Sequence, residues 1–279
     1  MATIGEMIGR GNVTRQDGCD TIVGNTAVGV ELELENAREL AMRIRDNDAT
    51  YWEVTRDDSL RDSGYEFIFR RPLGGKFIER ALTRFKEQYD ECERKPRGSV
   101  YCSTHVHMNF LDRTPEDVVK FLAVYLLLED GLARYCGEAR VNNLFCLTAS
   151  NAEDQLQAMA DIHANKSLEF IRMNGERGLK YSALNLVPLT TFGTLESRLG
   201  QGMTDPDQIR KWINILLSIK KYSEEQMHSP FDVLEKFSML GHEGFLKEVF
   251  GEYADELREY ITQDEMFEGV DRVQYILAI

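Results

Sequence analysis

The sequence predicts an α+β fold: an antiparallel sheet lined by acidic residues, with packed helices and a helical C-terminal region. The first observation is a set of short segments whose apolar residues recur at every second position, as in strands with one buried face. The second is a helical pattern that runs from residue 205 to about residue 262. The third is that ionisable residues occupy the polar faces of several strand-like segments.

The segment 27–35 alternates most clearly. Valine and leucine take one side, and Gly29, Glu31, Glu33 and Glu35 take the other. Because successive strand side chains point to opposite faces, Glu31 and Glu33 share a face, roughly 6–7 Å apart. A solvent-exposed polar face is common in antiparallel sheets, but three neighbouring carboxylates without Lys or Thr fit it poorly. We expect a strand with one buried and one acidic face.

A hairpin is predicted next, with strands Tyr51–Thr55 and Tyr65–Phe69 joined by the turn-rich residues 56–64. Glu66 lies among aromatic and apolar neighbours in the second strand, where a carboxylate needs a partner. The hairpin therefore adds a further acidic position to the sheet.

The segment 100–111 predicts another strand. His105, His107 and Asn109 share one face, and apolar residues take the other. One histidine alone would be read as a core residue, whereas two at this spacing followed by Asn form a polar row suited to ligands. The closing strand, 193–199, places Glu196 and Arg198 on one face in the same way.

Helices are predicted between and after the strands. Asn36 is expected to cap a helix to about Arg45, and a second helix follows Gly74 and Gly75 to about Glu93. Thr114 caps a buried helix that runs to about residue 135, because Pro and two acids follow it. The remaining expectations are a helix at 151–164, a strand-like segment at 180–188, and C-terminal helices with breaks near residues 229–230, 241 and 251.

The domain organisation follows from these elements. Residues 1–26 are expected to be a flexible lead-in, residues 27–204 a catalytic core, and residues 205–279 a helical region packed on the same domain.

The formal charge of −14 argues against binding to nucleic acid or to an anionic membrane. The longest apolar run, 121–128, is far shorter than the roughly 20 residues of a membrane span. Five scattered cysteines and the lack of a secretion signal predict a cytoplasmic protein with free thiols.

The charged rows point to a metal site, because crowded carboxylates and imidazoles are costly unless a cation lies between them. The set is rich in oxygen, which favours Mg²⁺ or Mn²⁺ over zinc, and its size suggests two or three ions. Clustered magnesium ions most often hold nucleotide phosphates, and Arg198 adds a bidentate donor for a phosphate oxygen. The sequence contains neither a P-loop nor a Gly-rich dinucleotide motif. The candidate ligands are Glu31, Glu33, Asp57 or Asp58, Glu66, His105 and Glu196.

The order of these motifs resembles the amidoligase family, the ATP-dependent carboxylate–amine ligases of the glutamine synthetase and glutamate–cysteine ligase superfamily. The resemblance covers about residues 27 to 200 and depends on the combination of motifs. It is carried by Gly29 to Glu33, Asp57 to Pro72, Cys102 to His107, Asn185, and Thr194 to Arg198. It implies a glutamine synthetase-like fold.

The resemblance also implies roles for individual residues. Metal ligands would be Glu31, Glu33, Glu66, His105 and Glu196, with Asp57 as the acid of the turn. The nucleotide would be bound by His107, Arg198 and Asn109, and the substrate by Asn185 and by Arg70 or Arg71. Two positions depart from the family pattern: Ser103 replaces a Gly, and Arg70-Arg71 replaces a Ser/Thr before Pro72. These arginines either meet a substrate carboxylate or simply end the strand.

The implied reaction transfers the γ-phosphate of ATP to a substrate carboxylate, and an amine then attacks the acyl phosphate to form an amide. Asp57, Glu196 and Arg198 would act in catalysis. The expected substrates are a small-molecule or peptide carboxylate and an amine, for which an amino acid is favoured. The resemblance is also consistent with a homo-oligomer. The alternatives are phosphotransfer without amide formation, as in guanidino kinases, a metal-dependent hydrolase using His105 and His107, and a non-catalytic binding protein.

Overall fold

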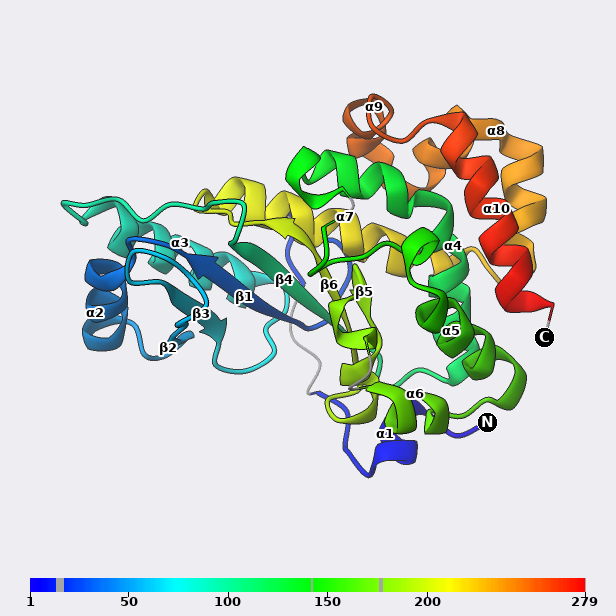
Figure 1. The fold of residues 1–279 in the computed structure, drawn as a ribbon, viewed down its shortest axis with the longest axis horizontal. Coiled ribbons are helices and arrows are strands. Elements are labelled where there is room, and N and C mark those ends of the chain that lie inside the picture. The colour runs from blue at the N-terminus through cyan, green and yellow to red at the C-terminus, as the bar shows by residue number, and fades with distance from the viewer. Residues whose placement is uncertain (14–17, 142, 176–177, 279) are drawn as a thin grey trace. The chain divides into compact units, whose positions relative to one another are not determined.

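The computed structural model describes residues 1–13, 18–141, 143–175 and 178–278. Its fold is α+β, with six strands in one open antiparallel sheet of order β2-β3-β1-β4-β6-β5 (Figure 1). The chain forms two compact units. We call residues 13–109 and 197–214 the sheet unit, and residues 1–12, 110–196 and 215–279 the helical unit. Each unit is built from separate stretches of chain, whereas the expected boundaries at residues 26 and 204 divide the chain into consecutive segments.

The sheet unit contains most of the sheet and two helices. Its elements are β1 (Val28–Leu34), α2 (Arg38–Asn47), β2 (Trp52–Arg56), β3 (Tyr65–Phe69), α3 (Lys76–Asp90), β4 (Ser103–Asn109), most of β6 (Thr194–Gln201) and the start of α7 (Pro206–Glu225). Every second residue of β1 is completely buried, from Val28 to Leu34, and the residues between them are half-buried. The predicted strand with one apolar and one acidic face is therefore confirmed.

The apolar face of the sheet is covered by helices of the same unit. The Trp52 ring lies 4.6 Å from that of Phe69 and 5.3 Å from that of Phe85 on α3. The Trp52 indole N–H also donates to the carbonyl of Ala81, at 3.0 Å. Helix α2 packs against β2, β3 and α3. Because this face is filled by aromatic and aliphatic side chains, the other face of the sheet is left for the polar residues.

The helical unit is organised around the long helix α4. Its elements are α1 (Ile4–Ile8), α4 (Pro115–Tyr135), η1 (Glu138–Arg140), η2 (Ala149–Asn151), α5 (Glu153–Asn165), α6 (Glu169–Asn174), η4 (Leu179–Tyr181), β5 (Leu184–Asn185), η5 (Val187–Thr190), α8 (Asp232–Phe250), η6 (Gly251–Tyr253), α9 (Ala254–Leu257) and α10 (Gln263–Leu277), with the start of β6 and the end of α7. Thr114 caps α4, as predicted, and nearly every residue of this helix is buried. Helices α5, α8, α9 and α10 pack around it. A Cβ on Gly269 of α10 would lie 2.7 Å from the Leu126 carbonyl oxygen, so glycine permits this close approach.

Part of the expected lead-in forms α1, which Thr3 caps and whose Ile4 is completely buried; residues 14–17 lie outside the described residues. Two local predictions are wrong. Asn36 does not cap α2: its backbone is left-handed (φ 53°), and its side-chain amide donates to the Lys95 carbonyl at 3.1 Å. The segment 180–188 is strand only at Leu184–Asn185, because 3₁₀ turns surround this short strand.

Candidate functional site

The polar face of the sheet brings the predicted acidic positions together. In the antiparallel register, Glu33 of β1 lies opposite Glu66 of β3. On the other side of β1, Glu31 lies opposite His105 of β4, and Gly29 lies opposite His107. Residues opposite each other in a sheet share a face with Cβ atoms about 4.5–5.5 Å apart. The structure thus places five of the predicted site residues on one face of three neighbouring strands.

Glu31 lies between the two histidines. One of its carboxylate oxygens is 3.1 Å from His105 Nδ1, and the other is 3.3 Å from His107 Nε2. Burial alone would raise the pKa of Glu31, but the hydrogen bonds from the two imidazoles hold this pKa well below its usual range. Glu31 is therefore an ionised carboxylate at the centre of the polar face, and its ligand atoms and those of His107 lie within 4.8 Å of one another.

Ser103 connects the second acid to the first. Its backbone N–H donates to Glu33 Oε2 at 2.8 Å, and its hydroxyl donates to the same oxygen. The Ser103 hydroxyl oxygen also lies 2.7 Å from His105 Nε2. Since Nδ1 of the same imidazole contacts Glu31, both ring nitrogens of His105 have protein partners. The two contacts fix the direction of the His105 ring, whereas His107 belongs to a group of residues that could hold a metal ion.

Glu66 is the least compensated of the acids. Burial, followed by the charge of Glu31, raises the pKa of Glu66 to about 7. A hydrogen bond from the Thr55 hydroxyl, at 3.2 Å, opposes this shift only in part. The charges of Glu33 and Asp57 raise the pKa of Glu66 further. A carboxyl group with a pKa raised by its neighbours' negative charges indicates a place where a cation would be stabilised.

The loop between β2 and β3 distinguishes the two candidate aspartates. Asp57 is half-buried and accepts hydrogen bonds from the backbone N–H of Ser59, at 2.8 Å, and from its hydroxyl, at 2.7 Å. Asp58 is exposed and forms an ion pair of 2.7 Å with Arg56. Asp57 is therefore the one held in a defined geometry near Glu66.

Four further predicted residues belong to the sheet unit. Asn109 is buried at the end of β4, and Arg198 is half-buried in β6. Arg70 follows β3 directly, and it and Arg71 are exposed. These positions are compatible with binding an anionic group, and their roles stay predictions.

Glu196 and Asn185 belong to the helical unit, where they contact each other. The Asn185 amide N–H donates to Glu196 Oε2 at 2.6 Å, and its amide oxygen accepts from the Val187 backbone N–H at 3.0 Å. Both ends of the Asn185 amide are thus used within the unit. The geometry indicates that Asn185 positions the buried Glu196 carboxylate.

Two residues of the polar face were not predicted as site residues. Ser103 was noted only as a departure from a family pattern, and Thr55 only as the end of a strand. The parity of the strands could have found both, because Thr55 lies opposite Glu66 and Ser103 is two residues before His105. Their hydrogen bonds to Glu66 and Glu33 make them positioning residues for the acids.

The comparisons with known proteins assign no family. Neither a scan of the sequence against protein-family models nor a search of curated proteins found a match. Within the described part of the chain, no helix combines the length and apolar character needed to cross a membrane. The geometry of the polar face and the resemblance of its motifs are therefore the observations that bear on function.

Proposed function

We propose that this protein is an ATP- and Mg²⁺-dependent carboxylate–amine ligase that forms an amide bond through an acyl phosphate. The observation that carries the proposal is the arrangement of Glu31, Glu33 and Glu66 on one face of two neighbouring strands. Burial, followed by the charge of Glu31, raises the pKa of Glu66 to about 7, so a cation next to Glu66 would be stabilised. The divalent ions that accompany a nucleotide would supply this positive charge.

The donor set fits hard divalent cations. Carboxylate oxygens predominate, and His107 contributes one imidazole next to Glu31. Oxygen-rich sets of this kind suit Mg²⁺ or Mn²⁺, whereas structural zinc sites use more Cys and His. When bound, two or three such ions would neutralise the nucleotide phosphates and the charge on the transferred phosphoryl group.

The residues of the chain would bind and orient the reactants. Ser103 and Thr55 hold the Glu33 and Glu66 carboxylates in fixed directions. Arg198 would donate to an oxygen of the transferred phosphate, since a guanidinium group matches its geometry. Glu196 would be a further metal ligand oriented by Asn185, in keeping with the resemblance. Arg70 or Arg71 would bind the substrate carboxylate.

Two other functions use the same residues. Phosphotransfer without amide formation would leave a free phosphorylated acceptor, whereas a ligase releases phosphate and an amide. A metal-dependent hydrolase would use His105 and His107, the two imidazoles that contact Glu31. That enzyme would bind zinc or iron tightly without a nucleotide.

The proposal is tested by metal and nucleotide binding. Mn²⁺ is titrated into the protein with a non-hydrolysable ATP analogue and followed by electron paramagnetic resonance. We expect saturable Mn²⁺ binding that requires the analogue and weakens by about tenfold or more in Glu33→Gln, since metal-site substitutions commonly cost this much. Asp58→Asn, in the exposed part of the loop, should bind as the wild type does. Normal binding by a folded Glu33→Gln variant would contradict the proposal, and tight zinc binding without nucleotide would favour the hydrolase.

A further inference from the structure

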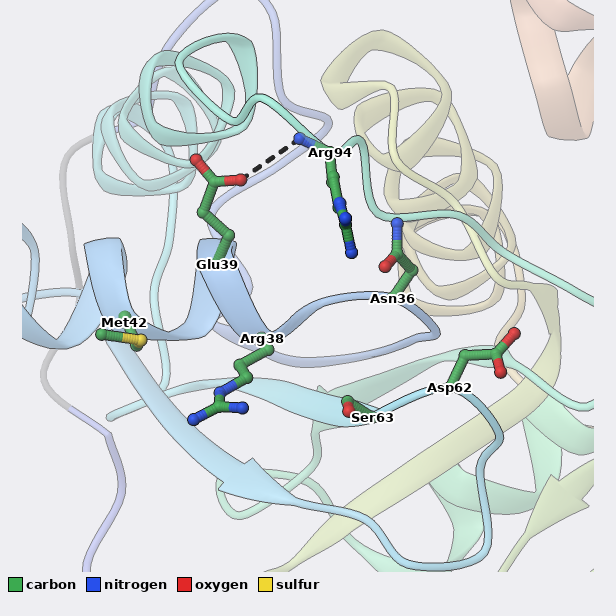
Figure 2. A pocket seen from close by; sticks show the side chains of 7 residues that line it. All are labelled: Asn36, Arg38, Glu39, Met42, Asp62, Ser63 and Arg94. Carbon is green, nitrogen blue, oxygen red and sulfur yellow. Dashed lines mark hydrogen bonds between the residues drawn. The ribbon is translucent and has the colours of Figure 1, made fainter.

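A second pocket lies within the sheet unit, and none of its lining residues is one of the acids or histidines of the polar face. Its volume is about 360 Å³, within the usual range for small-molecule sites. Three stretches of chain form it: the start of α2, the loop before β3 and the segment after α3 (Figure 2). Arg38, Glu39 and Met42 come from α2, Asp62 and Ser63 from the loop, and Arg94 from the third segment.

The acidic groups of this pocket already have partners. The Glu39 carboxylate accepts hydrogen bonds from the backbone N–H groups of Glu93, at 3.0 Å, and Arg94, at 3.2 Å. Figure 2 shows the bond from Arg94. These bonds, opposed by a smaller burial effect, lower the pKa of Glu39. Asp62 forms an ion pair of 2.9 Å with Arg97. The pocket walls are therefore held in place by groups that are no longer free to bind a ligand.

The two guanidinium groups that line the pocket, unlike its acids, are not engaged by other groups of the described chain. Among the residues that the structure describes, the side chains of Arg38 and Arg94 have no hydrogen-bond or ion-pair partner. The Arg94 side chain extends into the space between Asn36, Arg38 and Glu39 (Figure 2). The pocket therefore offers two guanidinium groups that are available to an anionic ligand, while its two acids are engaged elsewhere.

The backbone around the pocket is also fixed in an unusual form. Asn36, Asp62 and Ser63 have φ values of 53°, 51° and 59°, the left-handed region that few non-glycine residues adopt. Two backbone hydrogen bonds tie these positions together, from Asn36 N–H to Asp62 O at 2.9 Å and from Ala37 N–H to Ser63 O at 3.3 Å. The pocket is therefore built into the fold rather than left between mobile side chains.

We propose that this pocket binds a small molecule through its carboxylate groups, with Arg38 and Arg94 as the binding residues. Guanidinium groups pair with carboxylates in bidentate geometry, and a volume of about 360 Å³ suits a dicarboxylate or an amino acid. The exposed side chain of Met42 provides an apolar contact for the carbon chain, and Ser63 offers a hydroxyl. This binding site goes beyond the proposed ligase function and does not depend on it.

The test measures glutarate binding by isothermal titration calorimetry at low salt without metal or nucleotide. The wild type should bind glutarate, and Arg38→Ala and Arg94→Ala should each weaken binding by about tenfold or more, the value of a charge-assisted pair. Arg94→Lys should also bind less well, because lysine lacks the bidentate geometry. Arg80→Ala is the matched control, since Arg80 is exposed on α3 with its guanidinium group over the Phe77 ring.

Each other outcome overturns the inference. Glutarate that fails to bind the wild type, or binds Arg38→Ala and Arg94→Ala as tightly as the wild type, removes the site. Equal binding of the neutral dimethyl ester removes the role of the carboxylates, and binding of inorganic phosphate alone removes the assignment to this ligand class. Both arginines are exposed, so circular dichroism and thermal unfolding should show folded variants. Because no metal or nucleotide is present, failure here is distinguishable from failure of the ligase proposal.

Discussion

Glu33 and Glu66 lie directly opposite each other on β1 and β3, so two carboxylates occupy one cross-strand pair. Like charges in this position destabilise a sheet by up to about 1 kcal/mol. Glu66→Gln should therefore stabilise the metal-free protein, raising its melting temperature by about 2–4 °C. The same variant should lose most of the stabilisation that Mn²⁺ and a nucleotide analogue give to the wild type.

This prediction is measured by thermal unfolding in EDTA and again with Mn²⁺ and the analogue. Asp58→Asn serves as a control, since it removes an exposed acid from the same hairpin. A Glu66→Gln variant that is less stable in EDTA, yet equally stabilised by the metal complex, would show that Glu66 is a structural residue rather than a ligand.

Glu129, on α4, predicts a pH dependence of stability. Its side chain is completely buried, one oxygen accepts the Ala149 backbone N–H at 2.7 Å, and burial raises the pKa of Glu129 to about 8. The unfolded chain releases this proton near its ordinary pKa of 4.5. Stability from this group is therefore lost as the pH rises from about 4.5 to about 8, at about 1.4 kcal/mol for each pKa unit.

The neutral variant Glu129→Gln should remove that loss. Its free energy of unfolding relative to the wild type should increase by a few kcal/mol between pH 5 and pH 8. Urea unfolding at several pH values measures this difference, with the exposed Glu252→Gln as a control. Parallel pH curves for Glu129→Gln and the wild type would mean that Glu129 is not protonated in the folded state.

Asn185 allows a test of how Glu196 is held. Asn185→Asp would place a second carboxylate at the 2.6 Å contact with Glu196. Two carboxylates at this distance raise each other's pKa, so the variant should be least stable above the ordinary carboxyl pKa of about 4 and recover as the pH falls below it. Asn185→Ala loses the hydrogen bond without this repulsion. Melting temperatures of the two variants that change with pH in the same way would contradict the prediction.

The contact of α4 with α10 is sensitive to one methyl group. In Gly269→Ala the new Cβ would meet the Leu126 carbonyl oxygen and the Leu127 Cα, each at 2.7 Å. Both are backbone atoms of a buried helix, so the helices must move apart, at a cost of about 1–3 kcal/mol. Gly244→Ala in α8 is the control, because its nearest neighbour is the Leu240 side chain at 3.2 Å, and it should be neutral or stabilising. Equal unfolding free energies for the two variants would show that the helix contact can relax.

The strand periodicity predicted much of the sheet because it depends on neighbouring residues alone. The alternation of β1 and the pairing of Tyr65–Phe69 with β2 are both confirmed. The same parity placed Glu31 and His105 on one face, but only the register between strands shows that they lie opposite each other. Spacing along the chain places Ser103 on the same face as His105, but it does not show that Ser103 also donates to Glu33, because that hydrogen bond joins β4 to β1.

Turns and the pocket were least accessible from the sequence. Asn36 is a good helix cap by residue type, yet its left-handed backbone and its bond to Lys95 displace the start of α2. The pocket of Arg38 and Arg94 is formed by segments separated by about fifty residues. No local sequence pattern connects such positions. The sequence also does not show which groups pair with Glu39 and Asp62, so it does not reveal that Arg38 and Arg94 lack a partner.

The burial of α4 on all sides has a consequence for biosynthesis. This apolar helix leaves the ribosome well before α10, which starts at residue 263 and covers part of it. During that interval α4 exposes hydrophobic surface that the growing chain cannot yet cover, a state that attracts chaperones and favours aggregation. A chain that stops before residue 263 would keep this surface exposed. The yield of folded protein should therefore rise when synthesis is slowed at low temperature, and fall when the residues of α10 are removed.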